Sequence, residues 1–69
     1  MTTTEIYADY AVKINLHRVK KGLSIRDLAS RTRVSPTTIT GIEQGKGCSI
    51  DTLYKLCKEL NFTLTLEIN

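Results

Sequence analysis

The chain has 69 residues, of which 41% are hydrophobic, and its ten lysines and arginines against seven acidic residues give a formal net charge of +3. This length predicts a single domain with a marginal core, which usually needs a disulfide, a metal or a partner subunit. Two scattered cysteines and a lone histidine (Cys48, Cys57 and His17) favour neither a disulfide framework nor a metal centre, so self-association becomes the expected source of added stability.

The sequence also limits where the protein can be located and which partners it can bind. No apolar run approaches the roughly 18 residues of a membrane span, and the first ten residues lack the basic and apolar regions of a signal peptide. We therefore expect a cytoplasmic protein that needs no cofactor. The mild positive charge is compatible with nucleic acid, and all of its excess lies before residue 47.

A first helix is predicted over residues 4–21. A threonine among the first residues can cap it, Glu5 and Asp9 suit its positive start, and Gly22 can end it. One face at helical spacing holds Tyr7, Ala11, Ile14 and Arg18. A second, apolar stripe consists of Ala8, Val12, Leu16 and Val19. We expect this stripe to pack under a pair of C-terminal strands, with a partner-binding surface as the alternative.

Two short helices joined by a tight turn are predicted next, over residues 25–31 and 36–44. Ser24 and Asp27 form the acidic variant of a capping box, which predicts the start of the helix over residues 25–31. The second start follows from Ser35 as N-cap and Pro36 at the first helical position. The inward residues are Leu28 and Ala29 in the first helix and Ile39 and Ile42 in the second, which Gly45 ends.

A fourth helix is predicted over residues 50–60, capped by Ser49. Its apolar residues recur at helical spacing and are Leu53, Leu56, Cys57 and Leu60. After Asn61 the apolar period changes to two, which predicts a strand over residues 62–68. Because a lone strand leaves its backbone groups unpaired and the rest of the chain is helical, we expect it to pair with a second copy. The predicted dimerisation residues are Phe62, Leu64, Leu66 and Ile68.

Two short helices at this spacing are typical of a helix-turn-helix. The segment from Gly22 to Leu60 resembles the Xre/Cro/lambda-repressor family, most clearly at Gly22-Leu23, Leu28-Ala29, Val34-Ser35, Ile39, Ile42-Glu43 and Gly45. The resemblance implies an all-α, four-helix DNA-binding domain and covers about residues 11–60. The C-terminal strand stands where such domains have a fifth helix, and in this it is similar to HipB-type antitoxins, whose strands pair across a homodimer.

The resemblance also implies which residues contact double-stranded DNA. The third helix would enter the major groove, with helix-start and loop residues near phosphates. The implied contact residues are Ser24, Arg26, Ser35, Pro36, Thr37, Thr38, Thr40, Gly41, Gln44 and Lys46. Thr38 can alternatively serve only as a cap partner. Lys46 is expected to hold a phosphate, and Arg18 and Glu43 are implied to form an ion pair between helices 1 and 3.

Three positions depart from the family pattern. Ile25 replaces a frequent glutamine that binds phosphate, and Gly41 replaces a long polar base-reading residue. Arg33 stands where the turn usually has glycine, so a left-handed turn would strain it. Base reading would then rest on few side chains, with DNA shape contributing.

The remaining polar and sulfur-containing residues have ordinary interpretations. We expect His17 to be a partly exposed helix residue, Cys57 to be a small core residue, and Cys48 to lie in a loop with a redox role as a minor alternative. No nucleophile and base pair, carboxylate dyad or phosphate loop is evident in the sequence, so we expect no enzyme activity.

The sequence therefore predicts a dimeric repressor acting on a palindromic operator, encoded by a bacterium or a phage and associated with the nucleoid when bound. A restriction-modification controller is a variant of this hypothesis. The alternative is a HipB-like antitoxin that neutralises a HipA-type toxin kinase and regulates its own operon.

Overall fold

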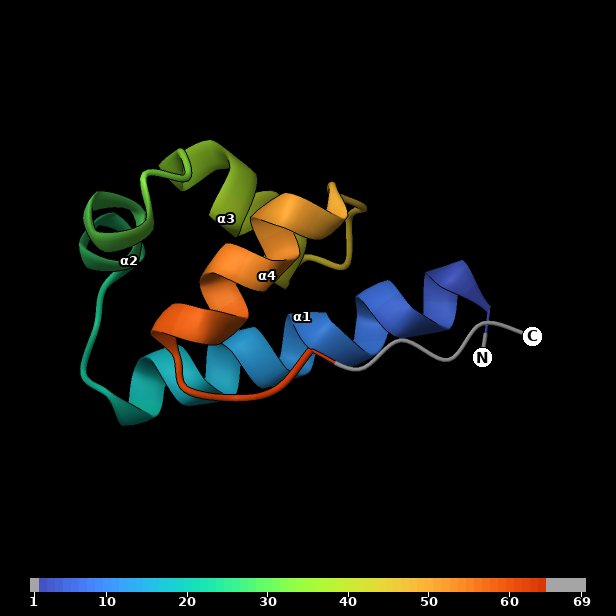
Figure 1. Cartoon of the computed structure of the whole chain (residues 1–69), viewed down its shortest axis with the longest axis horizontal. Helices are drawn as coiled ribbons and strands as arrows, with labels where there is room; N and C mark the ends of the chain where they lie inside the picture. The colour runs from blue at the N-terminus through green and yellow to red at the C-terminus, as the bar shows by residue number, and fades with distance from the viewer. Residues whose placement is uncertain (1, 65–69) are drawn as a thin grey trace.

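The computed structural model describes residues 2–64 and contains four α-helices there, joined by short connections (Figure 1). In chain order they are α1 (Thr3–Lys20), α2 (Ile25–Thr32), α3 (Pro36–Glu43) and α4 (Ile50–Glu59). The all-α fold with four helices is confirmed, and every helix end lies within one residue of its predicted bound. None of the helices in residues 2–64 is long and apolar enough to cross a membrane.

A hydroxyl side chain begins each of the four helices. The N-cap residues are Thr2, Ser24, Ser35 and Ser49, and each accepts a hydrogen bond from the backbone N–H three residues on. At α1 and α2 the carboxylates of Glu5 and Asp27 accept the reciprocal bond from the cap's own amide, which completes two capping boxes. These caps satisfy amides that would otherwise lack partners, and they fix where each helix starts.

Left-handed residues end the helices. Gly22 after α1 and Gly45 after α3 have φ angles of 71° and 89°, and each belongs to a Schellman motif. At the end of α2 the left-handed residue is Arg33, with φ 62° and ψ 23°. Arginine therefore takes a conformation that disfavours side chains with a Cβ, as expected from the missing glycine.

The core lies where the inner faces of all four helices meet. The largest side chains that are almost completely buried are Ile14, Leu28, Ile39, Leu53, Leu56 and Leu60. Cys57 is also buried, as predicted, and burial raises the pKa of its thiol to about 11. Ile6 and Tyr10 were not among the predicted inward residues of α1, yet they are 4% and 2% exposed.

The predicted strand is not seen where the structure describes the segment. Residues 62–64 are not in a strand, and Leu66 and Ile68 lie outside the described residues. Asn61 takes a left-handed φ of 61°, and the amide of Phe62 donates to the carbonyl of Cys57 in a third Schellman motif. The ring of Phe62 then stacks on His17 and Tyr10, with centroid distances of 4.6 and 6.1 Å.

This packing explains the difference from the predicted strand. Phe62 and Leu64 are instead partly buried against the core. The alternation of apolar residues after Asn61 therefore places Phe62 and Leu64 on the core side, without the strand that this pattern usually indicates.

The second apolar stripe of α1 lies on the surface. Val12, Leu16 and Val19 are 67%, 48% and 60% exposed, and Ala8 is exposed as well. Within residues 2–64 no segment covers this outer stripe, so the expected packing under a strand pair is not seen. We refer to these four residues as the α1 outer stripe.

Candidate nucleic-acid interface

The residues predicted to contact DNA come from the start of α2, from α3 and from the loop after α3. All of them are exposed except Gly41, which is half-buried. We call this set the α2–α3 surface, and its members are Ser24, Arg26, Ser35, Pro36, Thr37, Thr38, Thr40, Gly41, Gln44 and Lys46.

Helix α3 separates an apolar inner face from a polar outer face. Ile39 and Ile42 are 0% and 2% exposed and fix the helix to the core. Thr37, Thr40 and Gln44 point the other way, because successive residues of a helix are about 100° apart. Within residues 2–64 none of these three side chains makes a hydrogen bond, so their polar groups are open to solvent or a ligand.

Three of the predicted contact residues are engaged in helix caps. The Ser35 hydroxyl accepts from the Thr38 amide at 3.2 Å and donates to the Thr38 hydroxyl at 2.8 Å. Ser24 bonds with Asp27 in both directions at 3.0 Å, and these bonds lower the pKa of the Asp27 carboxyl. The structure thus gives Thr38 the cap role that was its alternative interpretation, while Arg26 stays exposed beside the Ser24 cap.

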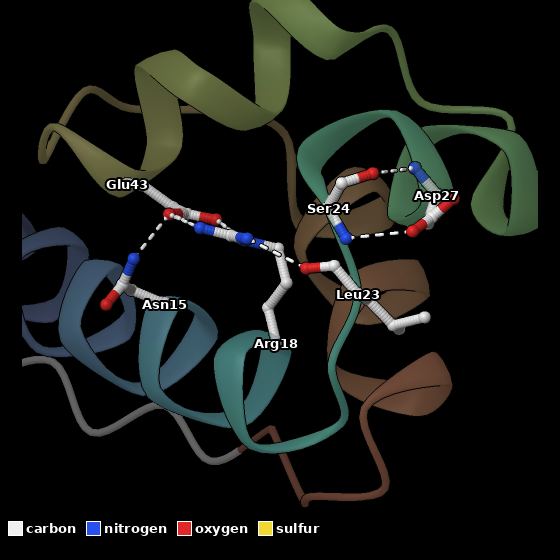
Figure 2. Close-up of polar contacts among 6 residues, drawn as sticks. All are labelled: Asn15, Arg18, Leu23, Ser24, Asp27 and Glu43. Atoms are coloured by element: carbon white, nitrogen blue, oxygen red, sulfur yellow. Dashed lines mark hydrogen bonds and ion pairs between the residues drawn. The ribbon is translucent and has the colours of Figure 1, made fainter.

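An ion pair joins α3 to α1 behind this surface. Arg18 Nε lies 2.8 Å from Glu43 Oε2, and Arg18 Nη2 lies 3.0 Å from Glu43 Oε1, so the pair is bidentate. Asn15 Nδ2 donates to the same carboxylate at 2.8 Å. Figure 2 shows Arg18 lying between Glu43 and the carbonyl of Leu23, to which its Nη1 donates at 2.8 Å.

The pair holds α3, α1 and the entry to α2 in one arrangement. Its side chains are only 14% and 10% exposed, for Arg18 and Glu43 respectively. Burial raises the pKa of Glu43, but hydrogen bonds from Arg18 and Asn15 outweigh it, and the pKa of this carboxyl is lowered. The hydrogen bond with Glu43 raises the pKa of Arg18. Both groups are thus held in their charged forms, and neither charge is free for DNA.

The loop after α3 is held by a residue that sequence reasoning did not assign to the site. Tyr7 Oη donates to the carbonyl of Cys48 at 3.1 Å. A Cβ added at Gly47 would lie 3.0 Å from Tyr7 Cε2, so the ring packs directly on this glycine. The sequence placed Tyr7 on the inner face of α1, but a contact spanning 41 residues has no local signal. Tyr7 therefore fixes the loop that carries Lys46.

This arrangement of caps, turn and exposed third helix is that of a helix-turn-helix. A family model described as helix-turn-helix matches residues 14–66 of the chain. The chain belongs to the helix-turn-helix family of the Xre and lambda-repressor type. The match includes α2, α3 and α4 and the end of α1 from residue 14, which carries Asn15 and Arg18. No curated protein and no solved structure was found to match the chain.

Membership in this helix-turn-helix family makes the chain a DNA-binding regulator of transcription in the general sense. The polar outer face of α3 and the short turn at Arg33 are features of the helix-turn-helix motif. The turn sets α2 and α3 relative to each other.

Proposed function

We propose that this helix-turn-helix protein is a sequence-specific repressor that binds a pseudo-palindromic operator as a homodimer. The observation that carries the proposal is the outer face of α3, where Thr37, Thr40 and Gln44 are exposed and make no hydrogen bond within residues 2–64. Such hydroxyl and amide groups can pair with base edges, and threonine methyl groups can contact thymine.

The dimensions and rigidity of α3 support placing it in the major groove. An α-helix with its side chains is about 10–12 Å across, which matches the roughly 12 Å width of that groove. The helix is anchored by Ile39 and Ile42 on one side and by the ion pair of Glu43 at its end. A rigid helix orders few groups on binding, which lowers the entropic cost of recognition.

The start of α2 supplies the positioning contacts in this proposal. Arg26 is exposed in the first turn, and the amides of that turn lie beside the Ser24 cap. A helix start and a cation together favour a backbone phosphate. Such contacts set the register of the protein on DNA and carry no sequence information themselves.

Homodimerisation would present two copies of α3 about one helical turn apart. The α1 outer stripe supports an association because Val12, Leu16 and Val19 expose apolar side chains on one helix face. The predicted strand over residues 62–68 is the other candidate interface. Both interfaces remain proposals, as does occlusion of a promoter as the mode of repression.

The antitoxin alternative rests on the resemblance of the C-terminal segment to HipB-type proteins, and no contact within residues 2–64 favours it. A gene for a kinase-like toxin next to this one would support that role, whereas neighbouring phage integration or lysis genes would support a prophage repressor.

The proposal is tested by selecting duplexes that bind the protein from a random pool. We expect a single enriched sequence with two-fold symmetry, bound by a dimer in sedimentation velocity experiments. Placing that sequence across a promoter should lower reporter expression when the protein is present. A pool that shows no enrichment, or binding that is equal on enriched and scrambled duplexes, would contradict the proposal.

A further inference from the structure

The side chain of Lys46 lies on the recognition helix itself. A Cβ added at Gly41 would be 3.5 Å from Lys46 Cδ and 3.9 Å from Lys46 Cβ, so the aliphatic stem of the lysine covers the place of the missing side chain. Gly41 is about 40° around the helix from Thr37 and about 60° from Gln44. The stem therefore lies on the outer face of α3, beside the proposed base-reading residues.

The backbone fixes this position from both sides. The Schellman motif that ends α3 makes Lys46 N donate to Gly41 O at 3.0 Å, with Gly45 at a φ of 89°. Beyond Lys46, the ring of Tyr7 packs on Gly47 and its hydroxyl holds the carbonyl of Cys48. A lysine on a free loop would sample many directions, but here both flanking segments are held.

We propose that Lys46 takes the place of the absent side chain at position 41 and contacts a guanine in the major groove. This inference rests on the proposed function, because it needs α3 to lie in the groove. An ammonium group has three hydrogen-bond donors and no acceptor, so it pairs with base edges that offer acceptors. Guanine presents N7 and O6 together there, and lysine or arginine on guanine is the commonest specific contact.

The proposal revises the expectation that Lys46 holds only a phosphate. A phosphate contact would lower affinity for every duplex alike when it is lost, whereas a base contact would change the preference for one base pair. Lys46 makes no ion pair within residues 2–64, so its ammonium group is available for either partner. The position of its stem on Gly41 favours the base.

The test uses the full chain and its selected operator, with each guanine replaced in turn by 7-deazaguanine, which removes the N7 acceptor and keeps base pairing. Wild type should lose affinity on the order of fivefold or more at one symmetric pair of guanines. Lys46→Met keeps the aliphatic stem and removes the charge. It should bind the unmodified operator more weakly and should show no further loss at that pair.

Lys55→Met is the matched control, because it removes one charge from an exposed lysine on α4 whose side chain is 52% exposed. This variant should keep the wild-type response to 7-deazaguanine. Equal weakening by Lys46→Met on operator and scrambled duplex, with the response to 7-deazaguanine unchanged, would overturn the proposal and restore the phosphate role. Failure of the wild type to select any sequence would instead reject the proposed function.

Position 41 offers a second, independent test. Gly41→Ala adds a Cβ at an ordinary contact distance from the lysine stem, so its response to 7-deazaguanine should remain. Gly41→Leu fills the space with an apolar side chain that displaces the stem and cannot hydrogen-bond to a base, so the response should be lost while thermal unfolding shows a folded protein. An unchanged response in Gly41→Leu would also overturn the proposal.

Discussion

The α2–α3 surface and the α1 outer stripe are both exposed, but they differ in chemistry. On α3 the exposed residues are Pro36 and three threonines, and the apolar residues Ile39 and Ile42 are turned completely inward. On α1 the exposed residues Val12, Leu16 and Val19 are apolar, although the same helix already buries another face. The first surface is therefore suited to a polar ligand as it stands, whereas covering the second surface would be favourable because it removes apolar side chains from water.

The Arg18 ion pair joins α1 and α3, the two helices that carry these surfaces. Arg18→Ala leaves the Glu43 carboxylate without its partner, and breaking a buried pair costs about 3–5 kcal/mol. Because the two side chains retain 14% and 10% exposure, we expect a loss near the lower end, about 3 kcal/mol, in urea unfolding. The control Asn15→Ala removes one exposed hydrogen bond and should cost about 1 kcal/mol. An Arg18 variant with wild-type stability and lost DNA binding would show that Arg18 belongs to the interface instead.

Acid should partly weaken the ion pair between Arg18 and Glu43. The pKa of Glu43 is lowered from its ordinary value of 4.5, so its contribution to stability is full above that pH and is lost as the pH falls through the lower, folded value. We expect the melting temperature of wild type to fall below about pH 4.5, and to fall less steeply in Glu43→Gln. Asp27 also has a lowered pKa, so some acid sensitivity should remain in that variant. Identical acid profiles for the two proteins would contradict the assignment.

A charge in the α1 outer stripe should separate association from DNA contact. If the stripe is the dimer interface, Leu16→Glu buries a carboxylate there, and we expect the dimer dissociation constant to rise roughly tenfold or more in sedimentation equilibrium. Deletion of residues 65–69 is the matched test of the C-terminal interface, because it leaves the Phe62 stack on His17 in place. If only the deletion yields monomers, the strand is the interface and the stripe is not.

Replacing Arg33, in the turn between α2 and α3, by glycine should stabilise the protein. Arg33 has a φ of 62°, and a left-handed conformation costs a residue with a Cβ about 1–2 kcal/mol, whereas glycine adopts it freely. After the larger entropy of glycine in the unfolded chain is subtracted, Arg33→Gly should stabilise the protein by about 0.5–1 kcal/mol. Asn61→Gly should gain less, because asparagine tolerates this conformation. A lower melting temperature for Arg33→Gly would show that its side chain makes a stabilising contact.

The fold was predictable where local chemistry decides it. Ser24 with Asp27 and Ser35 with Pro36 gave the helix starts, and Gly22 and Gly45 gave two of the ends, because caps act within a few residues. The position of Arg18 beside Glu43 came from the resemblance to the family, since nothing local joins residues 25 positions apart.

The remaining features depend on contacts between distant segments. The alternation after Asn61 suits a strand as well as a segment packed on α1, and in residues 62–64 the left-handed turn at Asn61 and the stack of Phe62 on His17 give the packed form. The contact of Tyr7 with Gly47 and the stem of Lys46 over Gly41 have no sequence period to reveal them. They emerge only once α1, α3 and the loop are placed together.

The most direct test of the α2–α3 surface is a titration of operator and scrambled duplexes with Thr37→Glu and with Thr4→Glu. Both exposed threonines acquire the same charge, but Thr37 lies in the first turn of α3 and Thr4 in the first turn of α1. Thr37→Glu should lose about 1–3 kcal/mol of discrimination at one symmetric pair of operator positions, while Thr4→Glu binds as wild type does. Wild-type binding and discrimination by Thr37→Glu would contradict the placement of α3 in the major groove.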